Sequence, residues 1–325
     1  MASAKDVDRY IQAATRENTR RSYRNAIQHF EASWGGFLPA TADSLARYLA
    51  DHAETLSVNT LKQRLAAIAQ WHIDQGFPDP TKAPLVRKVL KGIREVHPEK
   101  EKQAPPMQLF QLEQVVNWLD VEEQLAEAAS DQGIIIRCRR DRALVLLGFW
   151  RAFRSDELCR LRIEDIALQP DQGLTLYLPR SKSDRRAEGT NYKVPALSRL
   201  CPVKATQSWI DATERETGPV FCGVDRWGRI SADALHPNSI IPMLRALFGK
   251  AGIAGAEKFS SHSLRRGFAT WANNQGWDVK ALMEYVGWKD MKSALRYIDR
   301  PDLFPGHRVS KPIRNTCSSP KNNIF

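Results

Sequence analysis

The run Ala143-Leu144-Val145-Leu146-Leu147-Gly148-Phe149-Trp150 is the longest strongly apolar stretch of the chain, and an arginine stands on each side of it. Such a run is far too short to cross a bilayer, which takes about 20 residues of helix. Because apolar residues occupy every face, we expect residues 139–150 to form a helix that is buried on all sides. Arg154 and Glu157 follow it, so charged side chains are expected directly beside a hydrophobic core.

The next segments change from helical spacing to alternation. Leu174, Leu176 and Leu178 alternate with other residue types, which predicts a strand, and residues 190–194 alternate in the same way. The polar segment 180–189 joins the two strands as a hairpin. Elsewhere in this half we expect helices at 109–129, 155–161 (with Ser155 as its cap), 202–213, 237–248, 263–274, 279–286 and 292–297.

The first hundred residues show helical spacing and no strand pattern. Short helices of this kind predict a compact bundle. We expect a helix over 3–14, a second from its cap Asn18 to Ser33, a third opened by Thr41, a fourth capped by Ser57 and stopped by Gly76, and a fifth over 82–96.

Composition changes after this bundle. Residues 97–107 hold three prolines and four charged side chains, which predicts a stiff linker rather than a core. The expected division is therefore a helical domain at 1–96, the linker 97–107, a second domain at 108–300 and a tail at 301–325 that is extended or disordered until something binds it. A length of 325 residues agrees with two hydrophobic cores.

The charge balance indicates a polyanionic partner. Lys and Arg number 48 against 37 Asp and Glu, which gives a formal net charge of +11. Nucleic acid is the first explanation and an anionic membrane surface the second, while a basic protein without such a partner is the plain alternative. The N-terminus has no apolar signal region, and the five scattered cysteines form no Cys-x-x-Cys pair. These features predict a cytoplasmic protein with no membrane association, whose cysteines are core residues.

Several polar residues suit chemistry at a phosphodiester. The guanidiniums of Arg154 and Arg265 can grip its two non-bridging oxygens and neutralise the charge of a pentavalent transition state. The phenol of Tyr297 can attack phosphorus if a base such as His262 takes its proton. Lys182, on the predicted hairpin, can protonate the departing sugar oxygen.

Two further residues join this set. Glu157 stands three residues after Arg154, and the indole N–H of Trp288 can donate to phosphate while its ring packs. Taken singly, each of these residues has an ordinary explanation, such as a helix ion pair, a solvated lysine, a helix cap or a packed aromatic ring. Their combination is more specific than any one of them.

The order Arg, Lys, His-x-x-Arg, Trp, Tyr resembles the active-site signature of the tyrosine recombinases, also called the integrase family. The spacings resemble Cre-like members, with 28 residues from the first Arg to the Lys, 23 from the second Arg to the Trp and nine from the Trp to the Tyr. By resemblance, Arg154 and Glu157 form the first box, Lys182 is the hairpin lysine, His262 and Arg265 form the second box, Trp288 stands where many members have a second His, and Tyr297 is the nucleophile.

The resemblance implies a mainly α fold: an N-terminal helical bundle of the SAM-like, core-binding type and an α+β catalytic domain with a small antiparallel sheet. It also implies a clamp on double-stranded DNA, a homotetramer on two short inverted-repeat sites, and a 3′-phosphotyrosyl intermediate at Tyr297. It implies no cofactor: neither ATP nor metal. The sequence has neither a Gly-x-x-x-x-Gly-Lys-Ser/Thr loop nor the carboxylate cluster of a two-metal nuclease. Members dock a C-terminal segment onto a neighbouring protomer, for which Leu303 and Phe304 are the expected anchors.

Other functions share the chemistry or the DNA binding described above. A type IB topoisomerase-like enzyme or a hairpin telomere resolvase would use the same chemistry, and a catalytically silent accessory protein would bind DNA only. Among recombinase roles, the preferred hypothesis is resolution of transposon cointegrates, and an accessory DNA-binding protein is a further expected partner.

Basic and amide side chains outside the signature are candidates for DNA contact. By resemblance, the second and fourth helices of the bundle face the major groove, which makes Asn59 and Gln63 candidate base readers. Each candidate has a solvated helix face as its ordinary alternative. The others are Arg20, Arg21, Arg24, Lys62, Arg64, Arg87, Lys88 and Lys91 in the bundle, and Asn238 and Arg245 in the second domain.

Overall fold

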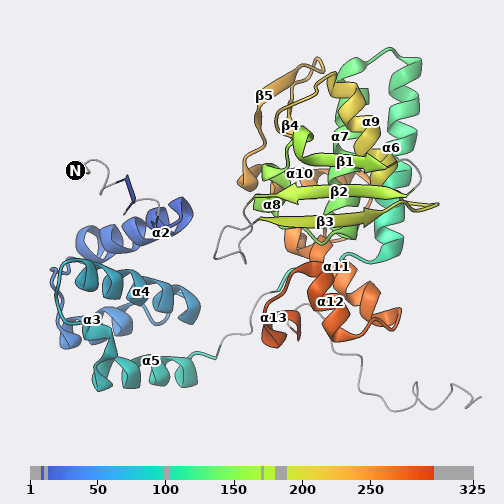
Figure 1. Ribbon diagram of the computed structural model, residues 1–325. Helices are drawn as coiled ribbons and strands as arrows, with labels where there is room; N and C mark the ends of the chain where they lie inside the picture. Colours follow the sequence, from blue (N-terminus) through green and yellow to red (C-terminus); the bar gives the residue numbers. More distant parts are fainter. Residues whose placement is uncertain (1–8, 11–13, 99–102, 170–171, 180–188, 296–325) are drawn as a thin grey trace, which may run out of the picture. The chain divides into compact units, whose positions relative to one another are not determined.

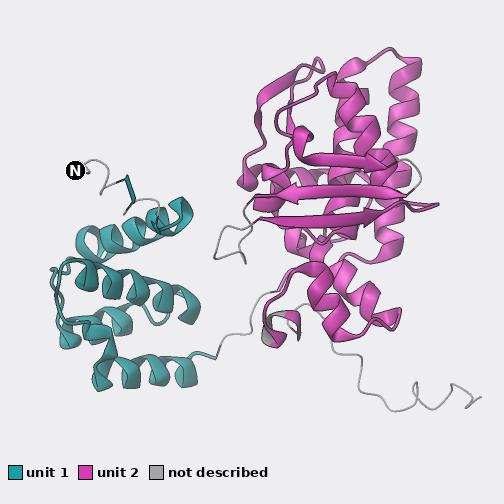
Figure 2. Ribbon diagram, in the orientation of Figure 1, with its two compact units in different colours: residues 1–102 teal, residues 103–325 magenta. Residues whose placement is uncertain are grey.

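Residues 9–10, 14–98, 103–169, 172–179 and 189–295 are described in the computed structural model. The chain divides into two units, residues 1–102 and 103–325 (Figure 2). The division falls inside the segment 97–107 that the sequence predicts as a linker. The predicted helix 3–14, the hairpin segment 180–189 and the tail 301–325 lie wholly or mostly outside the described residues, as do Lys182 and Tyr297.

All the secondary structure in the described part of unit 1 is helical. Its elements (Figure 1) are α2 (Glu17–Gln28), a π-helical continuation (His29–Ser33), α3 (Ala42–Asp51), α4 (Val58–Asp74), a 3-10 turn (Pro80–Lys82) and α5 (Pro84–Val96). Their apolar faces meet in a core that includes Phe30, Tyr48, Leu61 and Ile68. The spacing of apolar residues therefore predicted these helices correctly.

Capping side chains set two of the helix starts in this unit. Thr41 and Ser57 each accept a backbone N–H at 3.1 Å, which confirms both predicted caps. The prediction for Asn18 was wrong, because α2 begins earlier, with Arg16 in extended conformation at its N-cap. Asn18 lies inside the first turn, where its side-chain oxygen accepts from Arg21 Nη2 at 3.2 Å instead.

Unit 2 combines helices with two small antiparallel sheets. Strands β1 (Ile166–Gln169), β2 (Gly173–Leu178) and β3 (Thr190–Pro195) form one sheet in that order, and β4 (Cys222–Val224) pairs with β5 (Ile230–Ala234). Figure 1 shows α11 and α12 beyond the β3 edge of the larger sheet. The helices are α6 (Leu109–Ala128), α7 (Gln132–Trp150), α8 (Ser155–Arg160), α9 (Pro202–Thr213), α10 (Pro237–Lys250), α11 (Ser261–Asn274), α12 (Val279–Val286) and α13 (Met291–Leu295).

The structure corrects the sequence analysis at several boundaries of unit 2. Helix α7 starts well before residue 139, because the Asp131 side chain caps it by accepting the Ile134 N–H at 2.9 Å. Ser155 is not the cap of α8: Arg154 holds that position, and its N–H bonds to Glu157 rather than to a hydroxyl. Strands β1, β4 and β5 were missed, since each is short and none alternates between fully buried and exposed residues.

Helix α7 is the centre of the core of unit 2, as its apolar run predicts. Residues 143–149 are all buried. Helix α11 approaches it closely at two glycines: a Cβ on Gly148 would lie 2.9 Å from Leu264 Cδ1, and one on Gly267 would lie 2.9 Å from Phe149 Cε2. The end of α7 is therefore set against α11. None of the helices in the described residues, α7 included, is long and apolar enough to cross a membrane.

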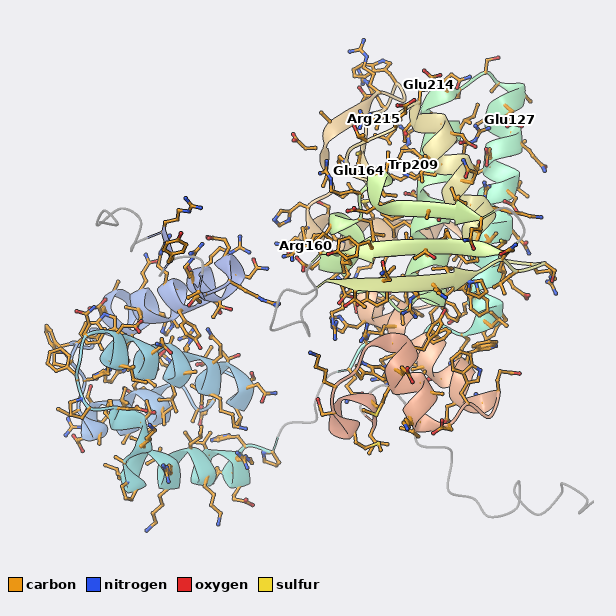
Figure 3. The ribbon with its side chains drawn as sticks, viewed as in Figure 1. Glu127, Arg160, Glu164, Trp209, Glu214 and Arg215 are labelled. Atoms are coloured by element: carbon orange, nitrogen blue, oxygen red, sulfur yellow. The ribbon has the colours of Figure 1, made fainter. Side chains whose placement is uncertain are left out.

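Helix α9 packs along α7 and is fixed by a buried tryptophan. Trp209 donates its indole N–H to the Val220 carbonyl at 2.6 Å, and Figure 3 shows its position. The cysteines of the described residues, Cys138, Cys159, Cys201 and Cys222, are buried free thiols, which confirms their predicted place in the core; Cys317 lies outside the described residues.

Candidate active site and nucleic-acid interface

Two arginines from different elements share one buried carboxylate. Arg154, at the N-cap of α8, donates from its backbone N–H to Glu157 Oε2 at 2.8 Å and from Nη1 to Oε1 at 2.6 Å. Arg265 of α11 brings its Nη1 to 3.9 Å from the same Oε2. Glu157 is only 3% exposed, so this carboxylate orients both guanidiniums from the protein side.

Arg265 is held from three further directions. Its Nη1 donates to the Ala152 carbonyl at 2.5 Å and its Nη2 to the Val286 carbonyl at 3.3 Å. Its Cζ lies 5.2 Å from the centre of the Trp288 ring. Both side chains are almost fully buried. A guanidinium fixed this firmly is preorganised, which is the property that makes a cation effective against charge that develops in a transition state.

His262 occupies the first turn of α11, three residues before Arg265, and its side chain is exposed. Ser260 caps this helix by accepting the His262 N–H at 3.2 Å. Ser155 Oγ donates to Ser261 Oγ at 2.7 Å, which ties the start of α8 to the start of α11. The predicted start of this helix at 263 was two residues late, because the cap is Ser260.

Two members of the predicted constellation cannot be placed. Lys182 and Tyr297 lie outside the described residues. Strands β2 and β3 flank Lys182 in the chain and pair up to Leu178 and Thr190, and α13 precedes Tyr297. The structure thus brings together Arg154, Glu157, Arg265 and Trp288, with His262 on the same helix as Arg265, while the roles of Lys182 and Tyr297 stay predictions.

A second cluster beside this one, which consists of one arginine and two tyrosines, was missed in the sequence analysis. The Arg151 guanidinium lies over the rings of both Tyr192 and Tyr285, with its Cζ 4.6 Å and 4.0 Å from their centres. Burial lowers the pKa of Arg151, against the opposing effect of Tyr285, and burial raises the pKa of Tyr285. Nothing in the local pattern pairs these residues, because they come from three distant segments.

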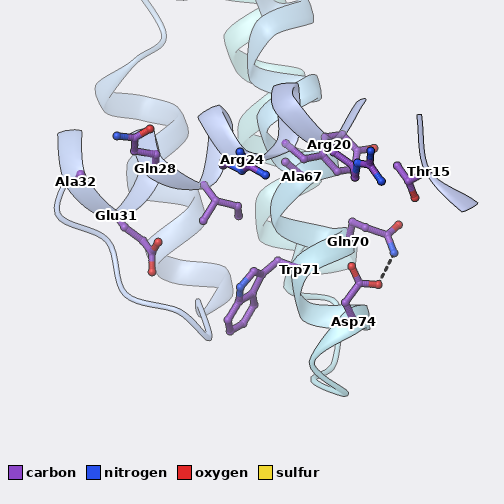
Figure 4. A pocket seen from close by; sticks show the side chains of 12 residues that line it. Thr15, Arg20, Arg24, Gln28, Glu31, Ala32, Ala67, Gln70, Trp71 and Asp74 are labelled. Atoms are coloured by element: carbon purple, nitrogen blue, oxygen red, sulfur yellow. Dashed lines mark hydrogen bonds between the residues drawn. The ribbon is translucent and has the colours of Figure 1, made fainter. Parts of the chain in front are cut away.

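Unit 1 carries most of the predicted DNA-contact residues. Arg20 and Arg24 line a hollow of about 700 Å³ between α2 and α4, beside Trp71 (Figure 4). Arg20 also pairs with Glu17. Of the predicted contact residues on α2, α4 and α5, those with exposed side chains are Arg21, Arg24, Asn59, Lys62, Arg87, Lys88 and Lys91.

Other candidates are bonded within the chain. The Gln63 amide donates to Ser22 Oγ at 2.6 Å, and Arg64 contacts His29 and donates to Tyr48 Oη at 2.9 Å. Burial and the Arg64 charge, with His52, lower the pKa of His29. In unit 2, Arg245 Nε donates to the Phe259 carbonyl at 2.9 Å, and Asn238 is exposed in the first turn of α10.

Comparisons with known proteins found matches over most of the chain. The model of the phage integrase family matches residues 106–302. An integrase/recombinase XerD homolog of Selenomonas ruminantium is 28% identical over 88% of this chain and 85% of its own length. The recombinase Cre of Escherichia phage P1 is 24% identical over 84% of this chain and 80% of its own.

Solved structures share the fold. The Tn1549 transposon integrase in complex with circular intermediate DNA gives a TM-score of 0.61 at 16% identity and covers 94% of this chain and 96% of that chain. A lambda integrase dimer bound to a core site gives 0.54 at 16% identity, covering 92% and 96%. The predicted fold class, a helical bundle plus an α+β domain with a small antiparallel sheet, is confirmed.

Proposed function

Because this chain belongs to the phage integrase family and is a tyrosine recombinase, we propose that it cuts and rejoins double-stranded DNA through Tyr297 at short inverted-repeat sites. The observation that carries the proposal is the pair of guanidiniums, Arg154 and Arg265, oriented by the single buried carboxylate of Glu157. Two such groups suit the two non-bridging oxygens of one scissile phosphate.

The proposed cleavage is a transesterification. The Tyr297 phenol oxygen forms a bond to phosphorus, and the bond from phosphorus to the 5′ oxygen breaks. His262 takes the phenol proton, and Lys182 gives a proton to the departing 5′ oxygen. The product is a 3′-phosphotyrosyl link with a free 5′-hydroxyl. Arg154 and Arg265 neutralise the charge that builds on the non-bridging oxygens, and Trp288 adds a hydrogen bond to phosphate.

Rejoining is the reverse step with a new partner. The 5′-hydroxyl of a second duplex attacks phosphorus, the bond to Tyr297 breaks, and the phenolate recovers its proton. In each step one phosphate ester bond forms and one phosphate ester bond breaks. The exchange needs no outside energy source.

We propose that the working assembly is a homotetramer on two DNA sites, helped in some contexts by an accessory DNA-binding protein. Its host role would be the resolution of transposon cointegrates. Similarity in fold to a transposon integrase, solved with circular intermediate DNA, supports a transposon-related role. Similarity in fold to a lambda integrase dimer, solved on a core site, supports action on a core site.

A supercoiled plasmid with two copies of the DNA that flanks this gene tests the function. We expect deleted circles and a protein-linked DNA band from the wild type without ATP or added metal, and neither from Tyr297→Phe. Tyr10→Phe, the same change at an exposed tyrosine of unit 1, is the matched control and should behave as the wild type. Relaxed circles alone would favour a topoisomerase, hairpin ends a telomere resolvase, and binding without any covalent band an accessory protein.

A further inference from the structure

Arg151, the C-cap residue that follows α7, lies in a row of stacked groups from four parts of the fold. Its guanidinium lies over the rings of Tyr192 of β3 and Tyr285 of α12, with its Cζ 4.6 Å and 4.0 Å from the two ring centres. The Tyr285 ring also stacks on Phe268 of α11, with 5.1 Å between ring centres and an interplanar angle of 25°. The row therefore joins β3, the end of α7, α12 and α11.

Burial of the Arg151 cation at this place has a large unfavourable free energy. Arg151 is only 6% exposed, and its Nε and Nη1 have no hydrogen-bond partner among the described residues. The two tyrosine rings supply cation–π attraction, but a buried charge without a full set of partners costs more than an apolar side chain of the same volume would. Stability alone gives no reason for an arginine here.

The neighbours of Arg151 supply a reason. Arg265 donates to the carbonyl of Ala152, which follows Arg151 in the chain, and to the carbonyl of Val286, which follows Tyr285. The Arg151–Tyr285 stack thus joins the same two backbone segments that Arg265 bridges with its hydrogen bonds. The stack and the two hydrogen bonds therefore act on the same separation, the one between residues 151–152 and 285–286.

We propose that Arg151 is a positioning residue for the reaction: it fixes the distance between residues 151–152 and 285–286 so that Arg265 meets the scissile phosphate in the productive orientation. The inference rests on the proposed function, in which Arg265 neutralises charge on the non-bridging oxygens. A lysine would keep the charge but not the planar group that fills the space between two rings.

The test compares two DNA substrates in single-turnover cleavage. One carries the natural scissile phosphodiester and the other a methylphosphonate, in which a neutral methyl replaces one charged non-bridging oxygen. A small misplacement of a catalytic group can cost about 10- to 100-fold in rate, so we expect a loss of that order for Arg151→Met on the phosphodiester. On the methylphosphonate there is less charge for Arg265 to neutralise, so the deficit relative to the wild type should shrink toward unity. Arg151→Lys should follow Arg151→Met.

Arg142→Met is the matched control, because Arg142 is a largely buried arginine of α7 that pairs with Asp120 and Glu123 away from this cluster. It should lower stability and leave the ratio of the two cleavage rates unchanged for the folded fraction. If Arg151→Met does not fold, Tyr192→Leu removes one ring of the stack and should show the same substrate-dependent deficit.

An equal deficit on both substrates, or none on either, would overturn the positioning role while the wild type still forms its covalent complex. A wild type that forms no covalent complex with the phosphodiester would overturn the proposed function instead, and the inference with it.

Discussion

Arg265 Nη1 donates to the carbonyl oxygen of Ala152 at 2.5 Å, and Ala152 has a left-handed backbone with φ of 54°. A residue with a side chain costs about 1–2 kcal/mol in that conformation and keeps it only where its surroundings require it. Here the surroundings are a nearly fully buried guanidinium and the buried turn from Arg151 to Phe153 that precedes Arg154. The hydrogen bond between Arg265 and the Ala152 carbonyl thus orients the guanidinium and helps to hold Ala152 in its strained conformation.

Substitutions at Ala152 should separate backbone strain from packing. Glycine adopts the left-handed conformation freely but is more flexible in the unfolded chain, so Ala152→Gly should change the free energy of unfolding by less than about 1 kcal/mol. Ala152→Val places a β-branched side chain at φ of 54° and should cost more than about 2 kcal/mol. Urea denaturation measures both, and equal losses would contradict a strained backbone at this position.

Arg265→Gln should impair cleavage far more than binding. The guanidinium is buried and preorganised, so its main contribution is expected in the transition state, where one such donor is worth about 100- to 1,000-fold in rate. Single-turnover formation of the covalent complex gives the rate, and fluorescence anisotropy with labelled DNA gives the Kd. A Kd that rises by the same factor as the rate falls would mean that Arg265 acts in ground-state binding.

Glu157→Gln should destabilise unit 2 by about 1–3 kcal/mol, because the buried guanidinium of Arg265 loses the carboxylate beside it and Arg154 loses a charged acceptor. The neighbouring Asp156 pairs with Arg160 at the surface, so Asp156→Asn is the matched control and should cost less than about 1 kcal/mol. Chemical denaturation of the two variants side by side checks the difference. If both lose the same amount, Glu157 is not the carboxylate that holds the cluster.

The sequence predicted the bounds of a helix well where a clear start residue accompanies the spacing of its apolar residues. The bounds of α9 (Pro202–Thr213) and α12 (Val279–Val286) match the predicted ranges, since a proline or an aspartate marks each start. Strands β1, β4 and β5 were missed because their residues have no strong local preference, and they exist only through pairing with partners elsewhere in the chain. The Arg154–Glu157 pair was visible as three-residue spacing, whereas the Tyr192–Arg151–Tyr285 stack was not, because only the folded chain brings those residues together.

Two buried thiols should be inert at neutral pH. Burial raises the pKa of Cys138 and of Cys159 to about 12, so both stay protonated in the folded state. Burial of the neutral thiols contributes fully to the free energy of unfolding at pH values below the pKa of a thiol in the unfolded chain. This contribution is lost as the pH rises toward 12. Mass-spectrometric mapping of iodoacetamide adducts at pH 8 should find both unlabelled in native protein and labelled in urea. Rapid native labelling would contradict their place in the core.

The most direct test of the central claim is identification of the residue that becomes joined to DNA. A substrate nicked beside the scissile phosphate traps the covalent complex, since the short 5′ fragment diffuses away. After nuclease and trypsin digestion, mass spectrometry should find a 3′-nucleotide on the peptide that contains Tyr297, and no such adduct in Arg265→Gln at the same time point. An adduct on any other residue, or none from the wild type on bound and nicked DNA, would contradict the account.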